Sequence, residues 1–133
     1  MTVSEPRVGC GAAIVIDRRI LLIRRLTDPE AGAWSLPGGK VDLYEAVPRA
    51  VEREVAEELG IVIVADDLLC VVDHIGEAQG YHWVAPVYRV GAFTGEPQVM
   101  EPTKHDAVDW FALDDLPSPL AASAVAAVSA LRS

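Results

Sequence analysis

Three glutamates, Glu54, Glu57 and Glu58, are spaced so that a helix would place them on one side. At about 100° per residue, their side chains fall within roughly 100° of one another around the helix axis. Neighbouring carboxylates repel each other, and partial burial of an unpaired charge costs on the order of several kcal/mol. A divalent cation offsets both effects, since Mg²⁺ is bound by carboxylates together with waters and substrate phosphates. The spacing therefore predicts a metal site suited to a phosphate-bearing substrate.

The helix that carries these acids also has an aliphatic stripe, formed by Val47, Val51, Val55 and Leu59. On the same helical wheel the stripe spans about 120° and borders or overlaps the positions of Glu54 and Glu58. The competing interpretation is a solvated acidic surface, which is the more common outcome for an isolated run such as EREVAEEL. The overlap with the stripe favours a partly buried acidic site instead.

These residues belong to a longer pattern, G-x5-E-x7-R-E-U-x-E-E-x-G-U with U aliphatic, which the chain matches at every defined position. The matching residues are Gly39, Glu45, Arg53, Glu54, Val55, Glu57, Glu58, Gly60 and Ile61. At ordinary residue frequencies, a chance match in a chain of this length is on the order of one in ten million. The segment therefore resembles the Nudix box.

The resemblance implies an α/β fold, the Nudix-type α/β/α sandwich with a mixed β-sheet, in a single domain over residues 1–133. It also implies that the box binds metal ions and a diphosphate, and that the protein hydrolyses a nucleoside diphosphate linked to another group. By position, Glu54, Glu57 and Glu58 correspond to metal ligands, with the carbonyl of Gly39 as a further ligand. Glu54 is the candidate that orients or deprotonates the attacking water, although family members differ in which glutamate does so.

Arg53 is expected to hold the loop and the helix together through an ion pair with Glu45, and it is included among the catalytic residues. Mg²⁺ is the expected ion, with Mn²⁺ as the alternative. The ion would reverse the local field of a chain with a formal net charge of −9 and a pI near 4.6, which would otherwise repel a diphosphate. The substrate is expected beside Gly38, Gly39 and Lys40, because glycines allow close backbone approach.

The loop before the helix departs from the usual box in two ways. Many family members have Gly directly before the first box glutamate, where this chain has Leu43-Tyr44-Glu45, and Pro48 is uncommon in such a box. Pro48 must lie in the first helical turn. We therefore expect a helix over residues 46–59, with Glu45 near the N-cap and Gly60 as the C-terminal cap.

Strand-like runs alternate with turn signals along the rest of the chain. The expected strands cover residues 8–17, 20–25, 61–64, 68–75 and 82–93, with a hairpin at residues 17–19. After a turn at residues 113–116, Ser118 is expected to cap a terminal alanine-rich helix that reaches about Leu131. The pattern indicates one mixed sheet flanked by helices, without repeats or linkers.

Candidate substrate contacts outside the box have competing interpretations. Trp34 either stacks on a base or shapes the loop as a core or rim aromatic. Arg24 or Arg25 faces a phosphate, since strand alternation turns only one of them inward, but solvated strand-end charges are the better expectation. Trp34 and Arg24 are retained as candidate substrate-binding residues. Metal-ligand spacing is absent among the three histidines, so surface or core roles are favoured for His74, His82 and His105.

The loop from Glu101 to His105 is a second candidate contact region. It follows the apolar pair Val99-Met100 and precedes Trp110-Phe111, so we expect it to be anchored at both ends and to reach the site from opposite the helix. Glu101 is expected to supply a metal ligand or a base, and Lys104 to contact phosphate or pair with Glu101. A solvated surface ion pair is the alternative.

Two further segments bear on the substrate. EPTKHD at residues 101–106 and WFALDDLP at residues 110–117 resemble segments of Nudix enzymes that act on nucleoside triphosphates. The markers for ADP-ribose and dinucleoside polyphosphates, Pro and Tyr, are absent around residues 75–77. We therefore expect a pyrophosphohydrolase that converts a nucleoside or deoxynucleoside triphosphate to the monophosphate and pyrophosphate. Hydrolysis of ADP-ribose or another nucleoside diphosphate derivative is the alternative, and a non-catalytic metal- and nucleotide-sensing module is the alternative outside enzymes.

Composition argues against several other classes of protein. The acidic balance and the lack of a basic patch argue against nucleic acid as the main partner. The sequence contains no apolar run near 18 residues and no leader-like start, so we expect neither a membrane span nor secretion. Cys10 and Cys70 lie in strand-like runs without CxxC spacing, as expected for reduced thiols of a cytoplasmic protein. Family members often form homodimers, but no residue pattern in this chain indicates one.

Overall fold

The computed structural model describes residues 5–133, which form one seven-stranded mixed sheet and two helices. The strands are β1 (Arg7–Ile16), β2 (Arg19–Arg25), β3 (Trp34–Ser35), β4 (Gly38–Lys40), β5 (Leu68–Gly76), β6 (Tyr81–Val90) and β7 (His105–Ala112). The helices are α1 (Val47–Leu59) and α2 (Ala122–Leu131). The main path of the sheet is β3-β2-β1-β6-β5, while β4 pairs with β1 and β7 pairs with β2. Of these pairings, β1 with β6 is parallel and the others are antiparallel.

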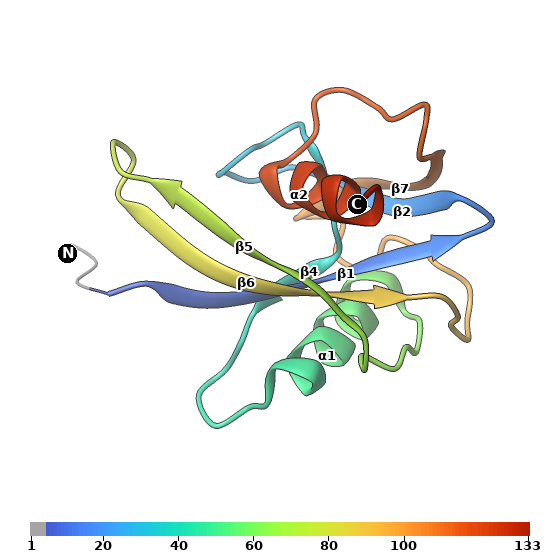
Figure 1. The fold of residues 1–133 in the computed structure, drawn as a ribbon, viewed down its shortest axis with the longest axis horizontal. Helices are drawn as coiled ribbons and strands as arrows, with labels where there is room; N and C mark the ends of the chain where they lie inside the picture. Colours follow the sequence, from blue (N-terminus) through green and yellow to red (C-terminus); the bar gives the residue numbers. More distant parts are fainter. Residues whose placement is uncertain (1–4) are drawn as a thin grey trace.

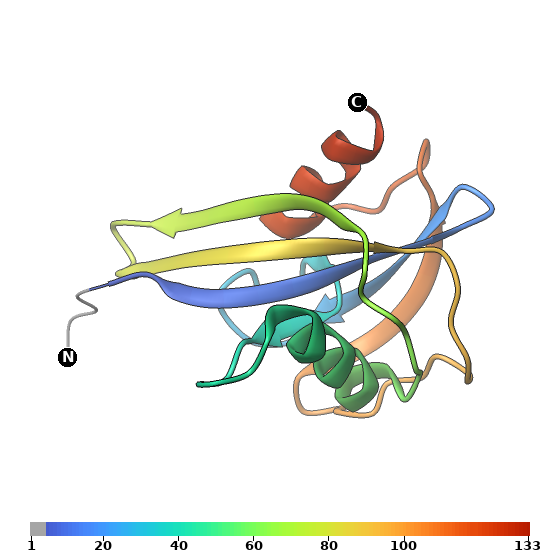
Figure 2. The same cartoon turned by 60° about the horizontal axis from the view of Figure 1, so that its bottom comes forward.

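The two helices cover opposite faces of the sheet (Figures 1 and 2). Strand β1 serves both faces because its side chains alternate: Ile14 packs in the cluster that includes α1, and Ala13 in the cluster that includes α2. On the α1 side, the predicted stripe contributes Val51, Val55 and Leu59, all completely buried. This arrangement confirms the predicted α/β/α sandwich with a mixed sheet.

Helix α1 ends where the sequence predicts and begins one residue later than expected. The N-cap is Ala46 rather than Glu45, and Pro48 occupies the first turn, where its missing N–H removes no helical hydrogen bond. At the other end, Gly60 has a φ of +71°, and its N–H donates to the carbonyl of Ala56. A left-handed residue at this position is easiest for glycine, which explains why the helix stops there.

One strand prediction was wrong, and three strands, β3, β4 and β7, were not predicted. Residues 61–64 form no strand; their only bridge joins Val62 to Thr94, while Ile61 and Ile63 are buried in the α1-side core. The alternating burial of residues 61–64 therefore belongs to a loop that lines the core, not to a paired strand. Conversely, residues 105–112 form β7, which pairs with β2 along most of its length. That strand was not predicted, because Asp106 and Asp109 interrupt its apolar pattern.

The predicted Ser118 cap was also wrong, because α2 begins only at Ala122. The preceding residues remain extended and pair with β3: Trp34 donates its N–H to the carbonyl of Pro119, and Ala121 donates to the carbonyl of Trp34. Instead of a hydroxyl from Ser118, a carboxylate oxygen of Glu30 accepts the first helical N–H, from Ala122, at 2.8 Å. Among residues 5–133, no helix is long and apolar enough to cross a membrane.

Candidate metal and diphosphate site

Strand β4 lies directly against α1, and its two glycines allow this close approach. The N–H of Gly38 donates to a carboxylate oxygen of Glu58 at 2.8 Å. A Cβ on Gly39 would overlap the carboxylate of Glu54, and a Cβ on Gly38 would overlap the backbone of Cys10. Side chains at both positions are therefore excluded sterically, which gives a physical reason for the paired glycines.

Arg53 connects helix α1 to the loop between β4 and α1, residues 41–46. Its guanidinium pairs with Glu45 at 2.7 Å, as predicted, and also donates to the backbone carbonyl of Lys40 at 3.0 Å. The same group reaches Glu54 at 2.9 Å and Glu57 at 3.2 Å. Hydrogen bonding to Arg53 lowers the pKa of Glu45 to about 2, so this carboxylate stays ionised. Arg53 therefore fixes the loop and two of the box acids in one arrangement.

The remaining box acid, Glu58, is buried to 6% exposure. Burial raises the pKa of its carboxyl to about 8, and the Gly38 N–H only partly opposes this effect. Burial likewise raises the pKa of Glu54, with Arg53 opposing, whereas the side chain of Glu57 is half exposed. Ionised Glu58 is therefore unfavourable until a positive charge approaches it.

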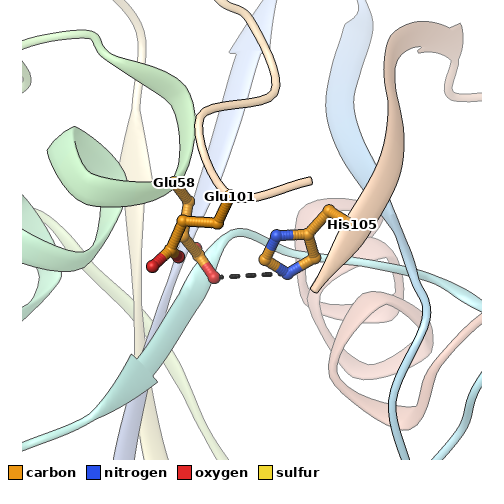
Figure 3. Close-up of side chains that lie close together, drawn as sticks. All are labelled: Glu58, Glu101 and His105. Carbon is orange, nitrogen blue, oxygen red and sulfur yellow. Dashed lines mark ion pairs between the residues drawn. The ribbon is translucent and has the colours of Figure 1, made fainter. Parts of the chain in front are cut away.

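The loop before β7 reaches this acid from the other side (Figure 3). Met100 donates its N–H to the carbonyl of Glu58, and Leu26 donates its N–H to the carbonyl of Lys104, so the loop is anchored at both ends. One potential ligand atom from each of Glu58, Glu101 and His105 lies within 4.8 Å of the others. The imidazole Nε2 of His105 is 3.4 Å from a Glu58 oxygen, and its buried Nδ1 has no hydrogen-bond partner among the described residues.

His105 is buried, one of the two roles that the sequence favoured, and it lies beside two carboxylates. The residue is only 4% exposed, and burial, aided by Arg25, lowers its pKa, so the imidazole is neutral at neutral pH. The sequence prediction compared the spacing of the three histidines with one another and did not consider the spacing between Glu101 and His105. In a single turn, Glu101 and His105 are close enough to face one ion.

A cavity of about 270 Å³ adjoins the box loop. It extends from Gly38, Gly39 and Lys40 to the start of α2, and it is lined by Arg25 and Trp83 among other residues. The hydroxyl of Ser35, which also lines it, is buried without a hydrogen-bond partner among the described residues. The cavity therefore combines apolar walls with a few polar groups, as small-molecule sites commonly do.

Three of the predicted substrate contacts, Arg24, Trp34 and Lys104, are not among the residues that line this cavity. Arg24 pairs with Asp106 at 2.8 Å and covers the ring of Trp34 at 5.5 Å. Trp34 packs edge-on against Phe111, with ring centroids 4.8 Å apart, in the α2-side core. Lys104 is mostly exposed and lies 3.4 Å from Glu101. Alternation along β2 turns Arg25 toward the cavity in place of Arg24, and Trp83 is the aromatic that lines it.

A divalent cation fits these residues on structural grounds. The Glu58 and Glu54 side chains are 7% and 16% exposed, Gly39 lies against Glu54, and the His105 Nε2 lies 3.4 Å from Glu58. A cation bound here would neutralise phosphate oxygens and lower the pKa of a bound water. The donor set of carboxylates and a backbone carbonyl is typical for Mg²⁺ or Mn²⁺.

Known proteins share this sequence and architecture. The model of the NUDIX domain matches residues 5–131. The solved MutT NUDIX hydrolase from Burkholderia pseudomallei is 62% identical, with a TM-score of 0.95 over 96% of this chain and 99% of that one. A putative 8-oxo-dGTP diphosphatase 2 of Mycobacterium tuberculosis is 39% identical over 113 residues, covering 83% of this chain and 76% of its own length.

The ADP-ribose pyrophosphatase of Methanocaldococcus jannaschii is 33% identical over 113 residues, which cover 85% of this chain and 66% of the archaeal protein. The names of the two curated relatives give different substrates, ADP-ribose and 8-oxo-dGTP. With a domain match over nearly its whole length, the chain belongs to the Nudix family and is a hydrolase of phosphoric anhydride bonds in nucleotide derivatives.

Proposed function

We propose that the protein is a Mg²⁺-dependent pyrophosphohydrolase that cleaves a nucleoside or deoxynucleoside triphosphate to the monophosphate and pyrophosphate. The observation that carries the proposal is the contact between the buried box acids and the Gly38-Gly39 loop, directly beside a cavity of about 270 Å³. Acids and a glycine loop supply a diphosphate site, while the cavity supplies space for the rest of a nucleotide.

Each side chain has a role that follows from its contacts. Glu54, Glu57 and Glu58, with the carbonyl of Gly39, would hold the cation, which lowers the pKa of the attacking water when bound. Glu54 would accept a proton from the attacking water, because it lies beside the Gly38-Gly39 segment where the diphosphate is expected. Arg53 keeps Glu54 oriented through the hydrogen bond between their side chains.

The size of the cavity favours a single nucleoside over a larger ligand. Ligand sites usually enclose about 300–1,000 Å³, and this cavity lies just below that range at about 270 Å³. A nucleoside triphosphate places one base and sugar there. ADP-ribose requires space for a second sugar, so it remains the alternative substrate, supported by the archaeal relative.

A panel of nucleoside triphosphates, deoxynucleoside triphosphates, oxidised nucleotides and ADP-ribose, assayed with Mg²⁺, tests this proposal. We expect pyrophosphate release from at least one triphosphate, and no turnover in excess EDTA. Preferential hydrolysis of ADP-ribose would establish the alternative activity. Nucleotide binding without turnover of any compound would instead establish the sensing module.

The proposed setting is the cytoplasm, without nucleic acid as a partner. Both cysteines are free thiols, which is usual for proteins of reducing compartments. Cys10 is buried, and burial raises the pKa of its thiol to about 11, so it remains protonated and unreactive. The net charge of −9 disfavours binding to a polyphosphate backbone.

A further inference from the structure

His105 provides a nitrogen donor at a site where the box supplies only oxygen donors. It lies at the start of β7, and its side chain points toward Glu58 of α1 and Glu101 of the preceding loop (Figure 3). With potential ligand atoms mutually within 4.8 Å, the three groups nearly match a six-coordinate ion, where bonds of about 2.1 Å separate opposite ligands by about 4.2 Å. A small rotation of the Glu101 side chain, which is 29% exposed, would close the difference.

A structural role does not account for both nitrogens of this imidazole. The distance from Nε2 to Glu58 is 3.4 Å, longer than an ordinary hydrogen bond, and Nδ1 is buried without a partner among the described residues. Buried polar groups are usually paired, yet this imidazole, only 4% exposed, has one long contact at Nε2 and no partner at Nδ1 among the described residues. The carboxylates of Glu58 and Glu101 lie close to this imidazole, and a cation between the three groups would offset the cost of holding both carboxylates there.

We propose that Glu58, Glu101 and His105 form a mixed oxygen and nitrogen site that selects a first-row transition-metal ion over Mg²⁺. The inference rests on the proposed function for the premise that Glu58 binds metal, and it deepens that function by naming the class of ion. Imidazole binds Co²⁺ and its neighbours in the transition series better than Mg²⁺, which strongly prefers oxygen. Gly39, Glu54 and Glu57 remain available to a Mg²⁺ that accompanies the substrate.

Spectroscopy of bound Mn²⁺ tests the nitrogen ligand directly. The wild-type protein, with ¹⁵N-labelled histidine and one equivalent of Mn²⁺, should show a ¹⁵N coupling in electron spin echo envelope modulation. His105→Gln should lose this coupling, whereas the matched control His82→Gln should retain it. Tightly bound Mn²⁺ without any histidine coupling in the wild type would overturn the proposal, whether or not the variants fold.

Ion selectivity gives a second readout, measured by calorimetric titration of the nucleotide-free protein with Co²⁺ or Mg²⁺. His105→Gln should weaken Co²⁺ binding by about tenfold or more and change Mg²⁺ binding far less, because loss of an imidazole removes the donor that Co²⁺ prefers. Since glutamine keeps an N–H that can donate to Glu58, equal losses for both ions would show that His105 only orients Glu58, and would refute the site.

The proposal and the enzymatic function can fail separately. Pyrophosphate release from a triphosphate without histidine coordination would leave the activity intact and reject the mixed site. Histidine coordination without hydrolysis of any nucleotide would support the mixed site and reject the enzymatic function.

Discussion

Glu58 is the residue on which the electrostatics of the site depend. It is buried, accepts the Gly38 N–H and lies near both Glu101 and His105. Within residues 5–133, neither lysine nor arginine forms an ion pair with it, whereas Glu57 pairs with Arg53. The burial of Glu58 therefore disfavours its ionised form unless a cation is bound.

The metal-free protein should lose stability as pH rises from about 4.5 to 8. Burial raises the pKa of Glu58 from its usual 4.5 to about 8, so in this interval the folded chain holds a proton that the unfolded chain has released. The loss should be on the order of a few kcal/mol. Because the pKa of His105 is lowered, its effect opposes this trend below about pH 6.5, and the slope should be clearest above that pH.

Melting temperatures in EDTA, measured from pH 6.5 to 8, check this expectation. Glu58→Gln should flatten the dependence, because glutamine does not titrate. Glu57→Gln is the matched control and should keep the slope, since that side chain is half exposed. An unchanged slope in Glu58→Gln would show that another group is responsible.

Gly39→Ala should remove most of the activity. Its Cβ would overlap the Glu54 carboxylate, so either the loop or the acid must move, and a displacement of about 1 Å at a reacting group can reduce the rate by about 100-fold. We expect kcat/KM to fall by that factor, about 2.7 kcal/mol. Gly91→Ala, where a Cβ would meet open space, is the control and should retain wild-type kinetics. If Gly39→Ala stayed within threefold of wild type, the close loop contact would be irrelevant to catalysis.

At the scale of elements, Arg53 makes β4, the following loop and α1 act as one unit. A lysine can pair with one of its partners but cannot bridge Glu45, the Lys40 carbonyl and Glu54 together. Arg53→Lys should therefore lower kcat by about tenfold or more through misplaced Glu54. Steady-state kinetics of this variant should be compared with those of a control, Arg49→Lys, which alters only the surface pair of Arg49 with Glu52. Equal activity of the two variants would contradict a positioning role.

The elements that sequence predicted best are those whose signals are local. For α1, a proline in the first turn and a glycine at the end fixed the boundaries to within one residue. For β7, the apolar pattern is interrupted by Asp106 and Asp109, and the strand exists because β2 offers a long pairing edge. Long-range pairing of this kind leaves no local pattern to read.

The same distinction applies to the candidate site residues. The box acids and Gly39 lie within 20 residues, Gly39 to Glu58, so spacing alone groups them. The choice between Arg24 and Arg25 depends on strand register, and the sequence left it open. Trp83 enters the cavity wall from β6, which pairs in parallel with β1 across a long stretch of chain. Only the folded sheet brings these side chains to the box loop.

At the scale of the whole molecule, the sandwich separates two tasks. Helices α1 and α2 lie on opposite faces of the sheet (Figure 1). The box acids Glu54, Glu57 and Glu58 belong to α1, while the cavity is lined by residues from β4 to the start of α2. The Gly38–Lys40 strand, paired to β1, is shared by both regions. A phosphate chain bound at this strand would therefore have the acids beside it and the rest of the nucleotide in the cavity.

Hydrolysis of the preferred triphosphate in ¹⁸O-labelled water, with Mg²⁺ and mass spectrometry of the products, tests the central claim most directly. If water attacks between the α and β phosphates, the products are the monophosphate and pyrophosphate, and one of these two carries the label. That is the result we predict, and it should vanish in Glu54→Gln and in EDTA. Release of labelled orthophosphate with a nucleoside diphosphate would place the attack at the γ phosphate and contradict the assignment.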